Sequence, residues 1–379
     1  MSLAGRAPSP IFMTADAIGG VWTYALELAR ALGGFGVDVA LATMGRALSA
    51  GEKKTAGAIP NLTVFESAYK LEWMDDPWND VEAAGEWLLG LSDEIEPAVV
   101  HLNGYSHGAL PWPAPALVVA HSCVYSWFEA VKRSAPPAEW DEYKRRVSAG
   151  LAAADLVTAP SGAMLADLNK HYGGFAAAPP VYNGRSAAHF KPAAKEPFVF
   201  TAGRLWDEAK NIAVLTEVAK NIAWPIVAAG DSAAPGRKAA RLDALKLLGR
   251  LDQAALAAQL ARASIFALPA RYEPFGYGPL EAALAGCALV LGDIPSLREI
   301  WGGAALFARP DDADSIAAAI GLLIDDAALR RWFAERARAH ALAFTPERMA
   351  AAYVGLYERL AYDPSRPAAA KKNLSMRVE

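Results

Sequence analysis

The chain has 379 residues, a length that predicts two domains at roughly 100–200 residues each. Apolar residues make up 54% and charged residues 21%, which excludes disorder, collagen and coiled coil for most of the chain. A net charge of −4 disfavours nucleic-acid binding through bulk charge.

Compartment signals are few. The two cysteines are too few for a disulfide framework or a four-thiolate zinc site, and they fit a reducing compartment. No run of 18 uninterrupted apolar residues predicts a transmembrane helix, and residues 1–10 lack the apolar stretch of a signal peptide. We therefore expect a cytoplasmic protein.

The first half alternates short apolar runs with helical patterns. A buried strand is predicted at 9–13, followed by Gly19-Gly20 and a helix that ends at Gly33-Gly34. Further strands are predicted at 37–42, 62–65, 98–101 and 116–120, with a helix at 81–91. This alternation predicts a mostly parallel α/β sheet.

Residues 173–197 are rich in proline, glycine and alanine, and we interpret them as a linker. The alternation then restarts, with predicted strands at 198–202, 225–229, 265–268 and 288–291 and helices at 211–220, 254–263 and 279–285. Two similar halves facing a cleft are expected, with ligands at the carboxyl ends of the strands. Thr345-Pro346 predicts the start of a last helix that runs to about Leu360.

The strongest chemical signal is the run Glu-Pro-Phe-Gly-Tyr-Gly-Pro-Leu-Glu from Glu273 to Glu281. Pro279 and Glu281 are expected in the first turn of a helix, where the missing proline N–H costs nothing. Free amides at a glycine-rich helix start bind anions or sugar hydroxyls, and the two carboxylates accept hydrogen bonds from hydroxyl groups. The alternative is that Glu281 only complements the helix dipole.

Two loops after predicted strands give further signals. Arg204 and Lys210, in the loop 203–211, supply a guanidinium fork and a point charge that suit a diphosphate; an ordinary solvated loop is the alternative. Gly19-Gly20 allows close backbone approach to a ligand, although tight turns of this kind are common. No Gly-x-Gly-x-x-Gly follows a strand and no P-loop motif occurs, so nicotinamide and P-loop sites are disfavoured.

Together these residues resemble the retaining glycosyltransferases of family 4, the group 1 glycosyl transferases, over nearly the whole chain. The run 273–281 matches the family's Glu-x7-Glu motif, residues 203–211 its phosphate clamp, and Gly19-Gly20 its N-terminal glycine loop. Residues 182–184 match the segment before the linker, although Ser186 stands where the family usually has Asp.

The resemblance implies the GT-B fold, an α/β architecture of two Rossmann-like parallel-sheet domains facing a cleft. The expected acceptor-side domain spans 1–190, joined by a C-terminal helix, 346–361, that crosses back to it. The expected nucleotide-sugar donor domain spans 191–345, and 362–379 is expected to be a disordered tail.

The resemblance also implies roles for single residues. Arg204 and Lys210 would hold the donor diphosphate, Glu281 the ribose, and Glu273 the donor-sugar hydroxyls, while His121 matches a position that contacts the donor sugar. The other residues expected around the donor are Gly19, Gly20, Gly203, Leu251, Phe275, Gly276 and Tyr277.

The implied reaction moves a sugar from a nucleotide-diphosphate sugar to an acceptor hydroxyl with retention, through an oxocarbenium-like front-side step. The leaving phosphate takes the acceptor's proton, and no metal or other cofactor is expected. The base (UDP, GDP or ADP), the sugar and the acceptor, which is a carbohydrate, a lipid-linked or a small molecule, stay open. A nucleotide-sugar epimerase and a non-catalytic nucleotide-sugar-binding protein are the alternatives.

The remaining polar residues are weighed singly. His107 and Tyr105 are candidates for the acceptor side, whereas His101 is interpreted as structural; no His-x3-His spacing predicts a zinc site. Asp312-Ala-Asp314 spells Asp-x-Asp, but its place before a helix indicates an N-cap rather than a metal motif. Lys132-Arg133 and the basic run 144–146 flank aromatic residues, which predicts either peripheral membrane contact or a solvated helix face.

Overall fold

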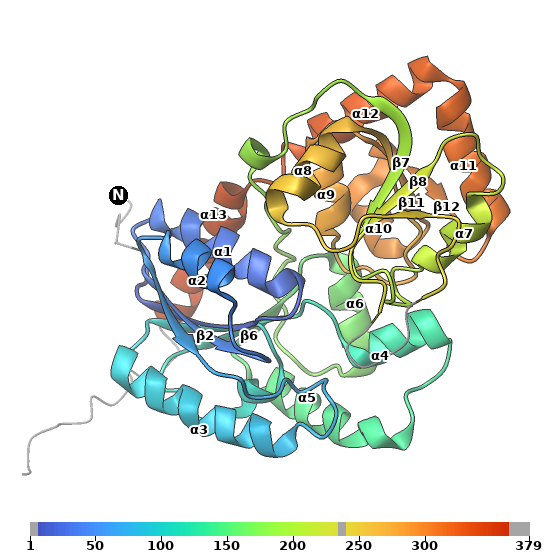
Figure 1. Ribbon diagram of the computed structural model, residues 1–379. Helices are drawn as coiled ribbons and strands as arrows, with labels where there is room; N and C mark the ends of the chain where they lie inside the picture. Colours follow the sequence, from blue (N-terminus) through green and yellow to red (C-terminus); the bar gives the residue numbers. More distant parts are fainter. Residues whose placement is uncertain (1–6, 234–239, 364–379) are drawn as a thin grey trace, which may run out of the picture.

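The computed structural model describes residues 7–233 and 240–363, and within them two parallel β-sheets of six strands each form the framework (Figure 1). The sequence alternation of strands and helices had predicted parallel sheets, and both are parallel throughout. Residues 364–379 of the expected tail lie outside the described residues.

The first sheet has the strand order β3-β2-β1-β4-β5-β6. Its strands are β1 (Ile11–Asp16), β2 (Val39–Met44), β3 (Leu62–Glu66), β4 (Val99–Leu102), β5 (Ala116–Val119) and β6 (Leu156–Thr158). Its helices are α1 (Gly20–Gly33), α2 (Ala50–Gly57), α3 (Trp78–Ile95), α4 (Val124–Trp127), α5 (Asp141–Ala153) and α6 (Gly162–His171). Strands β2, β4 and β5 are buried along their whole length because helices cover both faces.

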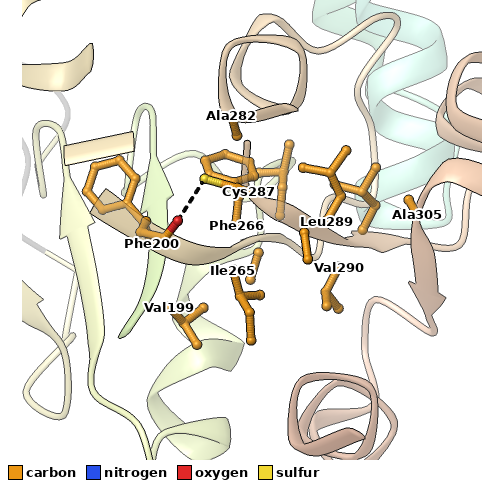
Figure 2. Close-up of a cluster of buried hydrophobic side chains, with 14 of the residues drawn as sticks. Val199, Phe200, Ile265, Phe266, Ala282, Cys287, Leu289, Val290 and Ala305 are labelled. Atoms are coloured by element: carbon orange, nitrogen blue, oxygen red, sulfur yellow. Dashed lines mark hydrogen bonds between the residues drawn. The ribbon is translucent and has the colours of Figure 1, made fainter. Parts of the chain in front are cut away.

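The second sheet has the order β12-β11-β10-β7-β8-β9. Its strands are β7 (Glu196–Ala202), β8 (Ile226–Ala229), β9 (Lys246–Leu247), β10 (Ala263–Leu268), β11 (Ala288–Gly292) and β12 (Leu306–Ala308). Its helices are α7 (Leu215–Val218), α8 (Gln253–Arg262), α9 (Tyr277–Leu284), α10 (Pro295–Trp301), α11 (Ala313–Asp325) and α12 (Ala327–Ala341). Figure 2 shows its core, in which Val199, Ile265 and Val290 lie on one face of the sheet. Phe200, Phe266 and Leu289 lie on the other face.

The last helix, α13 (Pro346–Ala361), leaves the second sheet and packs beside α1 of the first, where Tyr353 and Tyr357 enter the core (Figure 1). Thr345 caps it and Pro346 begins it, as the sequence predicted. Buried His101 contacts the hydroxyl oxygens of Tyr24 and Tyr357 at 3.1 and 2.7 Å. Burial lowers the pKa of His101 to about 3, so the imidazole is neutral and structural, as expected.

Some element predictions were wrong in extent. The helix expected at 211–220 is a 3-10 turn, Ile212–Val214, followed by the short α7. The short strands β6, β9 and β12 were not predicted. The boundary at 190/191 falls between the two sheets, in the irregular segment before β7, and stays a prediction.

Gly184 packs directly against the backbone of Thr345 and Pro346, where α13 begins. A Cβ at Gly184 would lie 2.3 Å from the carbonyl oxygen of Thr345, which is backbone and cannot move aside. We expect Gly184→Ala to destabilise the protein by about 1–3 kcal/mol through overpacking, measured by urea unfolding. Gly355→Ala is the control, because no atom lies within 4 Å there and α13 gains up to about 1 kcal/mol of helix propensity. Equal effects of the two substitutions would contradict this view.

Candidate functional site

The predicted residues gather where the carboxyl ends of the two sheets meet. Gly20 opens α1 directly after β1, and Tyr277 opens α9 in the other half. A Cβ built on Gly20 would lie 3.8 Å from Cδ2 of Tyr277, so the two helix starts are in contact distance. Each start leaves backbone N–H groups without an intrahelical acceptor, and these favour an anion.

The two predicted phosphate-binding cations are each paired with a carboxylate. The Nη2 of Arg204 lies 2.8 Å from Oδ2 of Asp207, and the Arg204 side chain is 47% exposed. The ammonium group of Lys210 pairs with Glu273, and both side chains are mostly buried. The structure thus brings the predicted clamp lysine and the predicted sugar-binding carboxylate together, and it holds each charge in place.

The loop that carries Lys210 is fixed by its neighbour Asn211. Asn211 has a left-handed φ of 56°, and its side-chain Nδ2 donates to the carbonyl oxygens of Pro269 and Pro310 at 3.1 and 2.6 Å. Gly203, at the start of this loop, has a φ of 145°, a conformation that glycine adopts readily. The backbone therefore presents Arg204 and Lys210 from a defined loop rather than a loose one.

The start of α9 is built on a glycine. Gly276 has a φ of 94°, and a Cβ there would come within 3.3 Å of Cγ of Glu273 and of the Pro279 ring. Phe275 is buried beside it, whereas Glu273 stands in the loop before the helix, as predicted. The prediction that Glu281 lies in the first turn was wrong, because α9 starts at Tyr277 and the carboxylate is one turn further in.

Glu281 is buried and bound to an arginine that the sequence did not indicate. Its Oε1 accepts from Nε of Arg185 at 2.8 Å, and Nη1 of Arg185 donates to Oε1 of Glu27 on α1 at 2.5 Å. Burial raises the pKa of Glu281, and the charge and hydrogen bond of Arg185 oppose that rise. Nothing in the composition around residue 185 links it to Glu27 or Glu281.

His121 follows β5 and contacts the side chain of Asn103, which follows β4. Nε2 of His121 lies 2.7 Å from Oδ1 of Asn103, while Nδ2 of Asn103 donates to the carbonyl oxygen of Thr14 at 2.7 Å. Because Oδ1 is an acceptor, Nε2 of His121 carries the proton and Nδ1 is left as an acceptor. Burial lowers the pKa of His121 to about 3, which keeps the ring neutral.

The two acceptor-side candidates have protein partners. Nε2 of His107 donates to the carbonyl oxygen of Val81 at 2.9 Å, and the buried Tyr105 donates its hydroxyl to the carbonyl oxygen of Ser122 at 2.7 Å. Leu251, which is expected around the donor, packs against the core of the second sheet. The acceptor-side roles of His107 and Tyr105 and the donor-side role of Leu251 stay predictions.

Comparison with known proteins places the chain in a family. A model described as Glycosyltransferase Family 4 matches residues 18–188, and one described as Glycosyl transferases group 1 matches residues 196–326. The chain belongs to the group 1/family 4 glycosyltransferases. These two matches cover every strand of the two sheets except β1, so the resemblance seen in the sequence is confirmed.

Curated relatives match part of this glycosyltransferase. A glycogen synthase from Mycobacterium tuberculosis is 43% identical over 106 residues, 27% of the chain and 26% of the relative. The O-antigen chain mannosyltransferase B from Escherichia coli is 33% identical over 116 residues, 31% of the chain and 30% of the relative. The chain thus spans less than a third of the length of these relatives.

Solved structures match almost the whole chain. A sucrose-phosphate synthase from Thermosynechococcus elongatus has a TM-score of 0.79 at 20% identity, covering 93% of this chain and 99% of that one. The Anabaena protein HepE in complex with UDP-glucose has a TM-score of 0.72 at 16% identity, covering 93% and 100%. With the two parallel sheets, these likenesses confirm the expected GT-B fold.

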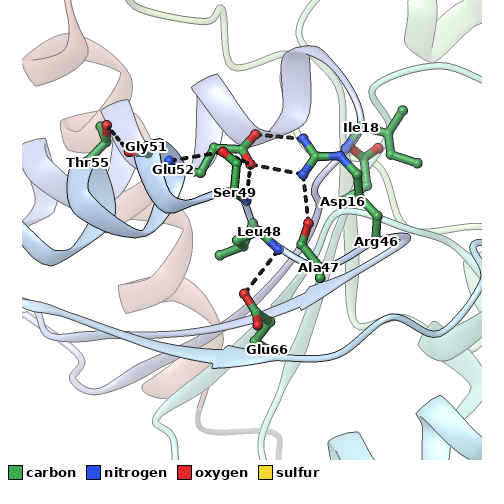
Figure 3. Close-up of polar contacts among 10 residues, drawn as sticks. All are labelled: Asp16, Ile18, Arg46, Ala47, Leu48, Ser49, Gly51, Glu52, Thr55 and Glu66. Carbon is green, nitrogen blue, oxygen red and sulfur yellow. Dashed lines mark hydrogen bonds and ion pairs between the residues drawn. The ribbon is translucent and has the colours of Figure 1, made fainter.

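Asp16 is a site residue that the sequence reasoning missed. It ends β1, just before Gly19-Gly20, and its Oδ1 accepts the N–H of Ile18 at 3.0 Å. Burial raises its pKa from 3.8 to about 6, opposed by the Ile18 N–H and by the charges of Arg204 and Arg46. Figure 3 shows Arg46 beside Asp16 while it binds Glu52. An acid at the end of the first buried strand was the available signal.

The other sequence signals have structural partners. Asp312 caps α11 by accepting the N–H of Ser315 at 2.9 Å, so the N-cap interpretation is confirmed. Within residues 7–233 and 240–363, no cluster of three or more His, Cys, Asp or Glu side chains forms a metal-binding group. None of the helices there is long and apolar enough to cross a membrane.

The basic pair proposed for a membrane surface faces the second half of the chain. Lys132 pairs with Glu208 at 2.6 Å, and Arg133 pairs with Asp311. Both carboxylates belong to loops of the second half, so these pairs join the two halves across the site's outer edge. Membrane contact through Lys132 and Arg133 stays a prediction.

Removing the negative charge of Asp16 is expected to raise the free energy of unfolding. A folded-state pKa above the ordinary value means that the folded protein binds this proton more tightly. The protein therefore loses stability as the pH rises from 3.8 to about 6, and the full cost of ionised Asp16 is present above that range. We expect Asp16→Asn to raise the free energy of unfolding at pH 8 by about 1–3 kcal/mol, with the gain fading toward pH 4. Urea unfolding at both pH values measures it.

The control for this experiment is Asp93→Asn, on the exposed face of α3, for which we expect no such gain. A loss of stability in Asp16→Asn that is equal at pH 8 and pH 4 would show that the carboxylate is needed as a structural partner.

Proposed function

We propose that this glycosyltransferase moves a sugar with retention from a nucleotide-diphosphate sugar to an acceptor hydroxyl, without an obligatory metal ion. The observation that carries the proposal is the Lys210–Glu273 pair beside the free helix start at Gly276, opposite Gly20. A cation, a carboxylate and two helix starts in one place suit a ligand that has both phosphate oxygens and sugar hydroxyls.

Most of the catalytic work in this proposal is electrostatic. Arg204 and Lys210 stabilise the charge that develops on the departing nucleotide diphosphate, and the amides of α1 and α9 add to that field. Because Lys210 already pairs with Glu273, a bound diphosphate takes over part of the ammonium's interaction. Glu273 is then released to accept hydrogen bonds from donor-sugar hydroxyls.

The sugar passes through an oxocarbenium-like state, and the acceptor attacks from the face that the diphosphate leaves. A leaving-phosphate oxygen takes the proton of the acceptor hydroxyl, so no side chain has to act as a covalent nucleophile. His121 is neutral with Nδ1 unprotonated, which suits it to accept a hydrogen bond from a sugar hydroxyl.

The donor and the acceptor are the least defined parts. HepE has been solved with UDP and UDP-glucose, which makes uridine nucleotides the first to test. A curated relative named as a glycogen synthase favours a carbohydrate acceptor, whereas one named as a phosphatidyl-myo-inositol mannosyltransferase favours a lipid acceptor. We propose a cytoplasmic, reducing setting, which the two free, buried cysteines support.

A nucleotide panel tests the donor site. We expect one of UDP, GDP or ADP, or its glucose or mannose conjugate, to raise the melting temperature, since a ligand at 100 times its Kd adds about 2.7 kcal/mol of stability. The shift is expected to persist in EDTA. No shift with any of these ligands in a folded sample would contradict the proposed donor site. Acceptor-dependent release of nucleotide then separates a transferase from an epimerase or a simple binder.

Removing both clamp charges is the second test. We expect Arg204→Ala with Lys210→Ala to lower kcat by about 10³ or more, because two charges that stabilise the leaving group are lost. The melting temperature should fall modestly, because the mostly buried Glu273 loses its cation, so kcat is measured well below the melting temperature of the variant. Turnover within tenfold of the wild type would rule out the clamp.

The matched control removes one arginine and one lysine elsewhere. Arg145 and Lys220 each form an exposed pair three residues from their partner, on α5 and after α7. Arg145→Ala with Lys220→Ala should leave both turnover and stability near wild-type values.

A further inference from the structure

Three buried charged side chains meet between the two sheets. The side chains of Glu27, Arg185 and Glu281 are 4%, 8% and 10% exposed. Arg185 lies between the two acids, with Nη1 2.5 Å from Oε1 of Glu27 and Nε 2.8 Å from Oε1 of Glu281. Its guanidinium also stands 5.2 Å from the centre of the Phe190 ring. We call these three residues the buried triad.

The positive charge of Arg185 offsets the repulsion between the two carboxylates of the buried triad. Two buried carboxylates without a positive charge between them repel each other, and one of them takes up a proton instead. Burial already raises the pKa of Glu281, and Arg185 is the first opposing influence. A guanidinium suits this place because its planar fork bonds two carboxylates at once and stays charged. Arg185 therefore opposes the uptake of a proton by Glu281.

The contact leaves one oxygen of Glu281 for a ligand. Arg185 binds Oε1, and among residues 7–233 and 240–363 no hydrogen-bond partner takes Oε2. The neighbouring Tyr277 is partly buried, and its hydroxyl oxygen is buried with no partner within this part of the chain. A fixed carboxylate with one unused oxygen beside an unpaired phenol is suited to form hydrogen bonds with a ligand's hydroxyl groups.

The triad also joins the two helices that open the site. Glu27 belongs to α1 and Glu281 to α9, while Arg185 comes from the irregular segment between the two sheets. The starts of α1 and α9 lie opposite each other at Gly20 and Tyr277. A single guanidinium thus links α1 to α9 through Glu27 and Glu281.

We propose that Arg185 is the positioning residue of the nucleotide's ribose subsite: it holds Oε1 of Glu281 so that Oε2 accepts hydrogen bonds from the ribose hydroxyls. This inference rests on the proposed nucleotide-sugar donor. It assigns to Arg185 a part in recognition through Glu281, with no contact of its own to the substrate. The contrasting view is that the triad only stabilises the fold, in which case apolar replacements would serve as well.

The test compares ribonucleotides with their 2′-deoxy forms, because only the ribose hydroxyl differs between them. Binding of UDP and dUDP, with GDP and ADP and their deoxy forms as further pairs, is measured by calorimetry at pH 7.5. We expect the wild type to bind the ribonucleotide at least tenfold more tightly, since a carboxylate left without its hydroxyl partner is penalised. In Arg185→Met this ratio should fall to within twofold of one, and Arg185→Lys should lie between.

Stability is separated from recognition by a second variant. Arg185→Met leaves two buried carboxylates, so Glu27→Leu with Arg185→Met is made to remove the repulsion and recover the melting temperature. We expect this double variant to fold well and still not to discriminate ribose from deoxyribose. Arg262→Met is the matched control, because it breaks an exposed arginine–glutamate pair with Glu196, and it should keep the wild-type ratio.

The outcomes are distinct. A wild type that binds none of the ribonucleotides overturns the proposed function. A wild type that binds ribonucleotides while the folded double variant keeps the full preference for ribose overturns the role of Arg185 and leaves the proposed function standing. A wild type that binds ribo- and deoxyribonucleotides equally overturns the ribose subsite itself.

Discussion

The parallel arrangement of the strands is the constraint on which this molecule depends. Because every strand of a sheet points the same way, all the loops that follow the strands gather at one edge. Here the two sheets turn those edges toward each other, so that Asp16, His121 and the loop of Arg204 and Lys210 reach one region from different strands. The return of α13 to the first core ties the two halves together at the opposite end of the chain.

Within that region, each cation is held by a carboxylate before any ligand binds. Arg204 has Asp207 and Lys210 has Glu273, so the side chains are ordered without a strong net positive field. Such preorganisation lowers the entropy cost of binding an anion, because the charges do not have to be collected when the ligand arrives. Under the proposed function, the exchange of Glu273 for phosphate on Lys210 would offset part of the binding energy and would free a carboxylate for the sugar.

The sequence predicted what local pattern determines and missed what long-range contact determines. Apolar periodicity located most strands, and Thr345-Pro346 located the last helix, since both signals lie within a few residues. Glu281 was placed one turn too early because Pro279 fits equally well at the first and the third helical position. Arg185 was missed because its partners are 158 and 96 residues away, a relation that no spacing rule carries.

Two acids of the site are penalised by burial, and the structure treats them differently. Glu281 receives a guanidinium in direct contact, which fixes its orientation and opposes the rise of its pKa. Asp16 receives one N–H bond, and the two arginines near it are occupied by Asp207 and Glu52. Under the proposed function, a donor phosphate on Arg204 would take part of that cation's field from Asp16 and strengthen the hold of Asp16 on a proton. The carboxylate of Asp16 would then be electrostatically coupled to the proposed donor site, whereas Glu281 keeps its guanidinium partner within the fold.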